Sequence, residues 1–273
     1  MPASAFGLAL TAAFLHALWN LLLARARDPE AATAVALVAA IILFAPVTAL
    51  VWEAEGAVWP YLLATATLHL AYFALLAGAY RRAELSLVYP VARGLAPILV
   101  LVVGVAVFAV DTSLLQAGAV CLVGAGILLV PGFGRHADPI GVAFGLAIAA
   151  CIAAYTLVDK EGIKHANPIT YLELSTVLAA VPYAAGVIAA KGASPLRREF
   201  GPATLIAGLA MFGAYALVLA ALRLAPAASV AAVRETSIVI ATVGAALVLK
   251  ERFGPARVIG AVLVVAGVIL LGL

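Results

Sequence analysis

The stretch AATAVALVAAIILFAPVTALVW, residues 31–52, decides the fold class, because it is as long as a bilayer is thick and carries no charged side chain. A hydrocarbon core about 30 Å thick needs roughly 20 residues of helix to cross it. Nine further stretches are similarly long and predominantly apolar. The ten predicted membrane segments are 3–24, 31–52, 57–80, 85–110, 112–131, 139–158, 168–190, 202–222, 226–249 and 255–273.

The composition excludes a water-soluble domain. Of the 273 residues, 66% are hydrophobic and 11% are charged, whereas soluble domains carry about 25% charged residues. The net charge of +3 comes from bases in short loops, so we expect no nucleic-acid partner. Cys121 and Cys151 lie inside apolar segments without a metal-binding spacing, and we expect no metal and no cofactor. Lipid offers the backbone no hydrogen-bond partner, so the sequence predicts an all-α integral membrane protein in the lipid bilayer.

The second five segments echo the first five, which predicts two five-helix units, 1–131 and 139–273. Because five is odd, the second unit crosses the membrane in the opposite direction. Inverted repeats of this kind are common in secondary transporters, whose substrate sites lie near the midplane between the repeats. The matched residues include Arg93 with Arg234, Tyr72 with Tyr215, and Trp19 with Tyr155.

The basic residues of the loops predict the orientation. Eleven lie on one predicted side, and three, Lys160, Lys164 and Arg223, lie on the other. Cytoplasmic loops are the basic ones, so we expect both termini to be extracytoplasmic, in the plasma membrane or bacterial inner membrane. The eleven bases are Arg25, Arg27, Arg81, Arg82, Arg135, Lys191, Arg197, Arg198, Lys250, Arg252 and Arg257.

A few ionisable residues lie deep inside the segments. Arg93 is flanked by Pro90 and Pro97 and lies roughly 12 Å into its segment, at 1.5 Å per residue. Arginine at the bilayer centre costs about 2.5–3.5 kcal/mol, so Arg93 and Arg234 are expected to face a cavity or a partner. One interpretation is that they bind a substrate carboxylate. The other is that they bond backbone carbonyls or Glu235 and only hold the helices together.

Aromatic and polar side chains suggest a cavity wall. His69 and Tyr72 are three residues apart and therefore share one helix face, as do His16 and Trp19. An aromatic wall with a few hydrogen-bonding groups suits small amphipathic metabolites, although such rings also pack between helices. Glu173 lies near the start of its segment, where it can reach interfacial water. The predicted substrate-binding residues are His16, Trp19, His69, Tyr72, Tyr89, Arg93, Tyr155, Tyr215 and Arg234.

Two motifs resemble a known family. Residues 83–93, AELSLVYPVAR, resemble a signature of the EamA family in the drug/metabolite transporter superfamily, and so do residues 249–253, LKERF, before a glycine-rich last segment. The resemblance implies two EamA units. It also implies a cavity surrounded by the first, third, fourth, sixth, eighth and ninth segments, with the fifth and tenth paired outside it. His69 and Tyr72 match a pair that lines the cavity in the aromatic amino-acid exporter branch.

The chain departs from this pattern in two places. Asp111 lies near the position where the second unit has Glu251, and the first segment lacks the carboxylate that couples protons in the related small multidrug transporters. His16 or His69 would substitute for that carboxylate.

We therefore expect a secondary transporter that exports small organic metabolites, with amino acids favoured, by alternating access. The alternatives are a transporter of sugars, nucleotide-linked compounds or cations, and, from another class, an intramembrane enzyme. The chain carries no His-Glu-x-x-His and no Gly-x-Ser-x-Gly motif, so we expect no catalytic residue.

Overall fold

The computed structural model describes residues 1–129, 138–249 and 254–273. Arg135, Lys250 and Arg252 of the predicted basic loops lie outside these ranges, as do residues 250–253 of the second family motif.

Helices make up nearly all of the described chain. The helices long and apolar enough to cross a membrane are α1 (Ala3–Leu23), α2 (Pro29–Leu50), α3 (Trp59–Arg82), α4 (Leu85–Ala106), α6 (Pro139–Gly162), α7 (Pro168–Lys191), α9 (Pro202–Leu224) and α12 (Pro255–Gly272). Shorter elements are η1 (Gly56–Val58), α5 (Leu114–Leu129), α8 (Ser194–Glu199), α10 (Ala227–Arg234) and α11 (Thr236–Leu249).

Local sequence sets where several helices begin. A proline occupies the first turn of α6, α7, α9 and α12, where its missing N–H costs no intrahelical hydrogen bond. Side chains of Asp28, Asp138 and Asn167 accept hydrogen bonds from the free N–H groups at the starts of α2, α6 and α7. These signals explain why the starts of the second-half helices agree with the predicted segment boundaries.

The predicted count of ten membrane helices is not confirmed, because the predicted segment 226–249 is not one helix. That segment is divided at Glu235 into α10 and α11, and the N–H of Glu235 bonds back to the carbonyl of Ala232 at 3.1 Å in a tight turn. The break coincides with an ion pair between Glu235 and Arg93 of α4. Hydropathy along one segment carries no information about such a partner on another helix.

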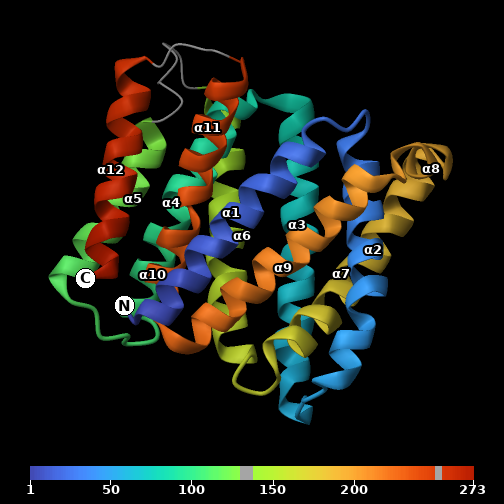
Figure 1. Ribbon diagram of the computed structural model, residues 1–273, viewed down its shortest axis with the longest axis horizontal. Helices are drawn as coiled ribbons and strands as arrows, with labels where there is room; N and C mark the ends of the chain where they lie inside the picture. The colour runs from blue at the N-terminus through green and yellow to red at the C-terminus, as the bar shows by residue number, and fades with distance from the viewer. Residues whose placement is uncertain (130–137, 250–253) are drawn as a thin grey trace.

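The helices form one bundle with a pair at its side (Figure 1). α5 packs along α12, and the pair joins the rest through α4 and α11. In the main bundle, α1 packs along α9, α6 along α3 and α4, and α2 along α7 and α9. Close approach in the side pair requires glycine, because a Cβ on Gly126 would lie 2.7 Å from the carbonyl oxygen of Gly260.

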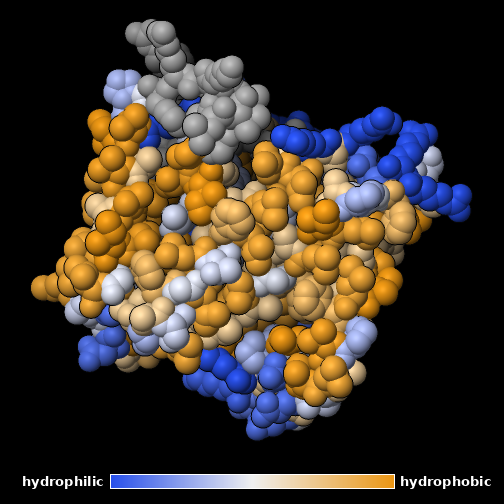
Figure 2. All heavy atoms as spheres, in the orientation of Figure 1, coloured by the Kyte–Doolittle hydropathy of each residue, from blue (hydrophilic) through white to orange (hydrophobic). Residues whose placement is uncertain are grey.

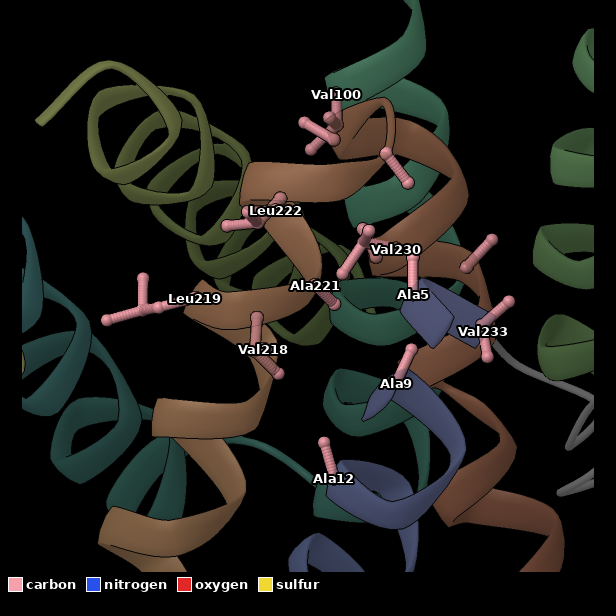
Figure 3. Close-up of a cluster of buried hydrophobic side chains, with 14 of the residues drawn as sticks. Ala5, Ala9, Ala12, Val100, Val218, Leu219, Ala221, Leu222, Val230 and Val233 are labelled. Carbon is pink, nitrogen blue, oxygen red and sulfur yellow. The ribbon is translucent and has the colours of Figure 1, made fainter. Parts of the chain in front are cut away.

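The surface and the core both fit a membrane environment. Hydrophobic atoms cover the middle of the face shown in Figure 2, and hydrophilic atoms gather at its two edges, one of them over α8. Inside, Ala5, Ala9 and Ala12 of α1 are fully buried against α9 and α10 (Figure 3). Helices in lipid associate by close contact of small residues, because burial from lipid adds no hydrophobic gain.

Candidate functional site

A cavity of about 510 Å³ lies inside the main bundle. Eight helices supply its walls, α1, α2, α3, α4, α6, α7, α9 and α10, and none of the described lining residues comes from α5, α11 or α12. The walls thus include α2 and α7 as well as the six segments that the family resemblance implies. All nine predicted substrate-binding residues line it: His16, Trp19, His69, Tyr72, Tyr89, Arg93, Tyr155, Tyr215 and Arg234.

The cavity reaches the surface where α1 ends and α2 begins. Ala24 and Pro29 are exposed and also line the cavity, with Asn20 and Glu30 beside them. Arg25 and Arg27, two of the predicted cytoplasmic bases, lie in this connection. The mouth therefore opens on the basic side of the chain.

Backbone pairing closes the opposite end, which we call the sealed end and define as residues 51–58 and 163–167 with the ends of α6 and α9. Ala54 forms an antiparallel bridge with Ala166. The N–H of Glu55 bonds the carbonyl of His165, and the N–H of Asn167 bonds the carbonyl of Glu53, both at 2.9 Å. The connection before α3 is thereby tied to the connection before α7.

Two cationic side chains, one on α6 and one on α9, connect the ends of these two helices at the sealed end. Lys160, near the end of α6, donates to the carbonyls of Leu222 and Ala225 at the end of α9. Arg223 of α9 donates to the carbonyl of Ile163 at 3.0 Å and to that of Ala166 at 2.7 Å, just past the end of α6. The last carbonyls of a helix have no intrahelical donor, so each helix supplies donors to the other.

An arginine cluster lies at the break between α10 and α11. Arg93 and Arg234 both donate to Oε1 of Glu235, at 3.1 and 3.2 Å, and the three side chains are 7%, 3% and 0% exposed. His16 accepts a hydrogen bond from Arg93 at Nε2, because a guanidinium has only donors, so its ring is neutral. The guanidinium of Arg93 also lies 5.5 Å from the ring centre of Tyr89.

This cluster has unused charge and unused hydrogen-bonding capacity. Two guanidinium groups share one carboxylate, which leaves one positive charge without a counter-ion among the described groups of the cluster. Nε of Arg234, Oε2 of Glu235 and Oγ of Ser237 are buried and have no hydrogen-bond partner in the described residues. Buried polar atoms are normally paired, so the cluster is suited to an additional polar group.

Aromatic rings form the facing wall. His69 stacks on Tyr155 with ring centres 4.4 Å apart, and Tyr215 meets the edge of His69 at 5.9 Å. Nδ1 of His69 lies 2.8 Å from the carbonyl of Thr65, which only accepts, so Nδ1 carries the proton. His16 and Trp19 form a second edge-on pair at 4.8 Å. The cavity therefore has a cationic region and a polar-aromatic region.

Asp159 is a further polar residue beside the cavity wall that was not among the predicted site residues. Its carboxylate is fully buried and accepts hydrogen bonds from Tyr171 at 2.8 Å and from Tyr215, which lines the cavity. The predicted segment ended at residue 158, whereas α6 continues to Gly162. Asp159 follows Tyr155 by four residues and shares its helix face, which is the signal that could have found it. Glu173, which was expected to reach interfacial water, is instead buried, with 6% of its surface exposed.

Comparisons with known proteins agree with this architecture. Residues 139–273 match the family model described as the EamA-like transporter family. No curated protein matches the sequence. A solved structure titled "Crystal structure of protein" aligns with 99% of this chain and 96% of that chain, with a TM-score of 0.77 and 18% sequence identity. At this identity the likeness shows a shared fold. The family match and the apolar helices together indicate a multi-pass membrane protein.

Proposed function

We propose that this chain, whose second half matches the EamA-like transporter family, is a secondary transporter that exports small organic metabolites, with amino acids favoured. The observation that carries the proposal is the cavity between the helices, about 510 Å³ in volume and open at one end. Ligand pockets of this size hold small organic molecules and combine apolar walls with a few polar groups.

The charge of the cavity favours a substrate with a carboxylate. Arg93 and Arg234 line the cavity and share a single acid, Glu235. A second carboxylate would neutralise the remaining positive charge, and the planar guanidinium binds carboxylates through two parallel hydrogen bonds. The rings of His69, Tyr155 and Tyr215 would then contact the apolar part of the substrate.

Helix packing supports the predicted inverted repeat. If the sixth predicted segment corresponds to the first, then α6, α7 and α9 correspond to α1, α2 and α3. A two-fold axis would then make the contact of α1 with α9 equivalent to the contact of α6 with α3. The same axis would make the contact of α2 with α9 equivalent to the contact of α7 with α3. All four contacts occur. Alternating access by rocking of one repeat against the other requires interfaces of this kind.

The position of the mouth suits an exporter in a loading state. The mouth lies on the side whose loops carry most of the bases, which is the predicted cytoplasmic side. A substrate from the cytoplasm would enter this cavity directly. Release on the other side would require the sealed end to open.

Counterflow into proteoliposomes tests the proposal. The probes are L-phenylalanine, 3-phenylpropionate, which keeps the carboxylate, phenethylamine, which lacks it, and glucose. We expect uptake of L-phenylalanine and 3-phenylpropionate and none of the other two. Transport of phenethylamine or glucose alone would overturn the carboxylate class, and the absence of counterflow with all four would overturn the proposed amino-acid transporter.

Arg93→Lys tests the role of the guanidinium directly. Lysine keeps the positive charge but lacks the planar guanidinium, which can donate two parallel hydrogen bonds to a carboxylate. We therefore expect counterflow of L-phenylalanine to fall roughly tenfold, corresponding to about 1.4 kcal/mol. Arg27→Lys, at an exposed arginine, is the matched control. If Arg93 only braces the helices, the variant instead melts at a lower temperature and its flux per folded molecule stays unchanged.

A further inference from the structure

A second, smaller cavity of about 80 Å³ lies beside the sealed end. Its walls come from the last turns of α4 and α6, from α5 and the connection before it, and from the start of α10. None of its lining residues also lines the main cavity. A cavity of this size has room for a few water molecules or for one small anion. The proposed transport function makes no use of it.

The start of α10 supplies free hydrogen-bond donors to this second cavity. No side chain caps the helix, and the N–H groups of Ala227, Ala228 and Ser229 form no hydrogen bond within the described part of the chain. Ala227 is 8% exposed and Ser229 is 2% exposed, so water outside the protein does not reach these groups freely. Buried N–H groups at a helix start normally have partners. All three residues line the second cavity, which is therefore the place for such a partner.

Two side chains add further donors. Ser229 lines the second cavity, and its hydroxyl group has no hydrogen-bond partner among the described residues. Lys160 also lines the cavity and donates to the carbonyls of Leu222 and Ala225, which uses two of the three N–H groups of its ammonium. Ala225 is two residues before the first residue of α10, so the ammonium lies close to the start of that helix. Backbone and side-chain donors therefore meet at one small cavity.

The charge of the second cavity favours an anion over water. Both hydrogen bonds of Lys160 go to neutral carbonyls, and it pairs with no acid in the part of the chain that the structure describes. Glu161, the acid that lines this cavity, is instead paired with Lys164 at 2.6 Å. The peptide dipoles of a helix add partial positive charge at its start. A water molecule accepts only two hydrogen bonds and leaves this charge unbalanced, whereas an anion accepts several and balances it.

We propose that the second cavity is a binding site for one small monovalent anion of the size of chloride. The anion accepts hydrogen bonds from the first N–H groups of α10, from the hydroxyl group of Ser229 and from the ammonium of Lys160. It thereby connects the start of α10 to the end of α6, which already bonds the end of α9. Binding therefore stabilises the closed form of the sealed end. The site goes beyond the proposed function and does not depend on it.

Bromide locates the site directly, because it resembles chloride in size and scatters X-rays anomalously. In crystals of the full chain grown in bromide, we expect an anomalous peak in the second cavity, within hydrogen-bonding distance of Oγ of Ser229. The peak should be weaker in crystals of Ser229→Ala. Density for water only in this cavity, or bromide peaks that all lie elsewhere on the protein, would overturn the site.

Thermal unfolding in detergent tests the stabilising role. At constant ionic strength, chloride in place of gluconate, which is too large for the cavity, should raise the melting temperature, because a ligand of the folded state stabilises it. Ser229→Ala should reduce this chloride-dependent rise at least about twofold. Ser229→Asp places a carboxylate in the first turn of α10, so it should raise the melting temperature in gluconate and remove the response to chloride.

Ser194→Ala, at an exposed serine of α8 near the mouth, is the control and should keep the full response to chloride. A parent protein whose melting temperature is the same in chloride and gluconate would overturn the site. So would a response to chloride that is unchanged in Ser229→Ala or in Ser229→Asp.

Discussion

The two ends of the bundle are held together by different interactions. The sealed end is closed by paired backbone groups and by Lys160 and Arg223, whose cations bond helix carbonyls. The end with the mouth is held by side-chain ion pairs, in which Lys191 contacts Asp28 at 2.9 Å and Glu30 at 2.7 Å.

The two ends therefore differ in kind: hydrogen bonds to backbone carbonyls hold the sealed end, and ion pairs that salt can screen hold the end with the mouth. Hydrogen bonds to carbonyls at helix ends resist salt and cannot be replaced by water without separating the helices. Exposed ion pairs contribute about 0–1 kcal/mol and weaken with ionic strength. We infer that opening the sealed end is the costlier step of the proposed cycle.

A disulfide across the sealed end should have the largest effect. Ala54 and Ala166 form an antiparallel bridge, in which Cα atoms lie about 4.5–5.5 Å apart, within reach of a disulfide. In a chain with Cys121→Ser and Cys151→Ser, oxidation of Ala54→Cys with Ala166→Cys should reduce counterflow at least about tenfold, and reduction should restore it. Ala166→Cys alone is the control. Full flux through the cross-linked protein would show that this end does not have to open.

Removing one brace should lower stability substantially. Arg223→Leu deletes the donors to Ile163 and Ala166, and hydrogen bonds that involve a charged group are worth about 1.5–3 kcal/mol. We expect a clear fall in the melting temperature of the protein in detergent. Arg27→Leu, at the mouth, should change stability by less than about 0.5 kcal/mol. Equal effects of the two substitutions would remove the distinction between the ends.

A smaller loss is expected from Tyr171→Phe. The substitution removes one of the two hydroxyl donors to Asp159 and leaves the ring in place. Loss of one hydrogen bond to a buried carboxylate should cost about 1–2 kcal/mol. Thermal unfolding measures it, and Tyr61→Phe, whose ring stacks on His165, is the aromatic control. A stability unchanged by Tyr171→Phe would show that this hydrogen bond does not contribute to the stability of the fold.

The smallest effect is expected at the mouth. Lys191→Gln removes the ion pairs with Asp28 and Glu30, which should cost at most about 1 kcal/mol at low salt and less at high salt. Melting curves at several salt concentrations check this. A loss that persists undiminished at high salt would contradict a screened contact.

Low pH should also weaken the ion pair between Lys191 and Asp28 and so lower the stability of the protein. Partial burial raises the pKa of Asp28, but the hydrogen bond from Lys191 and the N–H of Ala31 lower it by more, so its pKa lies below the usual value. The folded state then binds fewer protons than the unfolded state. The stability contributed by Asp28 is present above the unfolded pKa of about 3.9 and is lost as pH falls through the folded pKa. In Lys191→Gln we expect the loss of stability as pH falls below about 3.9 to be smaller, as thermal unfolding over a pH series would measure.

The sequence by itself determined the membrane class and most helix positions. Segment length and hydropathy are properties of one helix in lipid, so they predict α1 to α4, α6, α7, α9 and α12 without knowledge of their neighbours. Residues such as His69 and Tyr72 could be grouped because three positions along a helix return to the same face. All nine predicted residues lie at one cavity for that reason, while their role in binding remains a prediction.

Only the tertiary structure decided which charges meet and which end is open. The break at Glu235 involves Arg93 of α4, and Asp159 accepts hydrogen bonds from Tyr171 of α7 and Tyr215 of α9. Each of these pairings depends on the rotation and register of helices distant in sequence. Those quantities are set by packing of the whole bundle, and local periodicity carries no information about them.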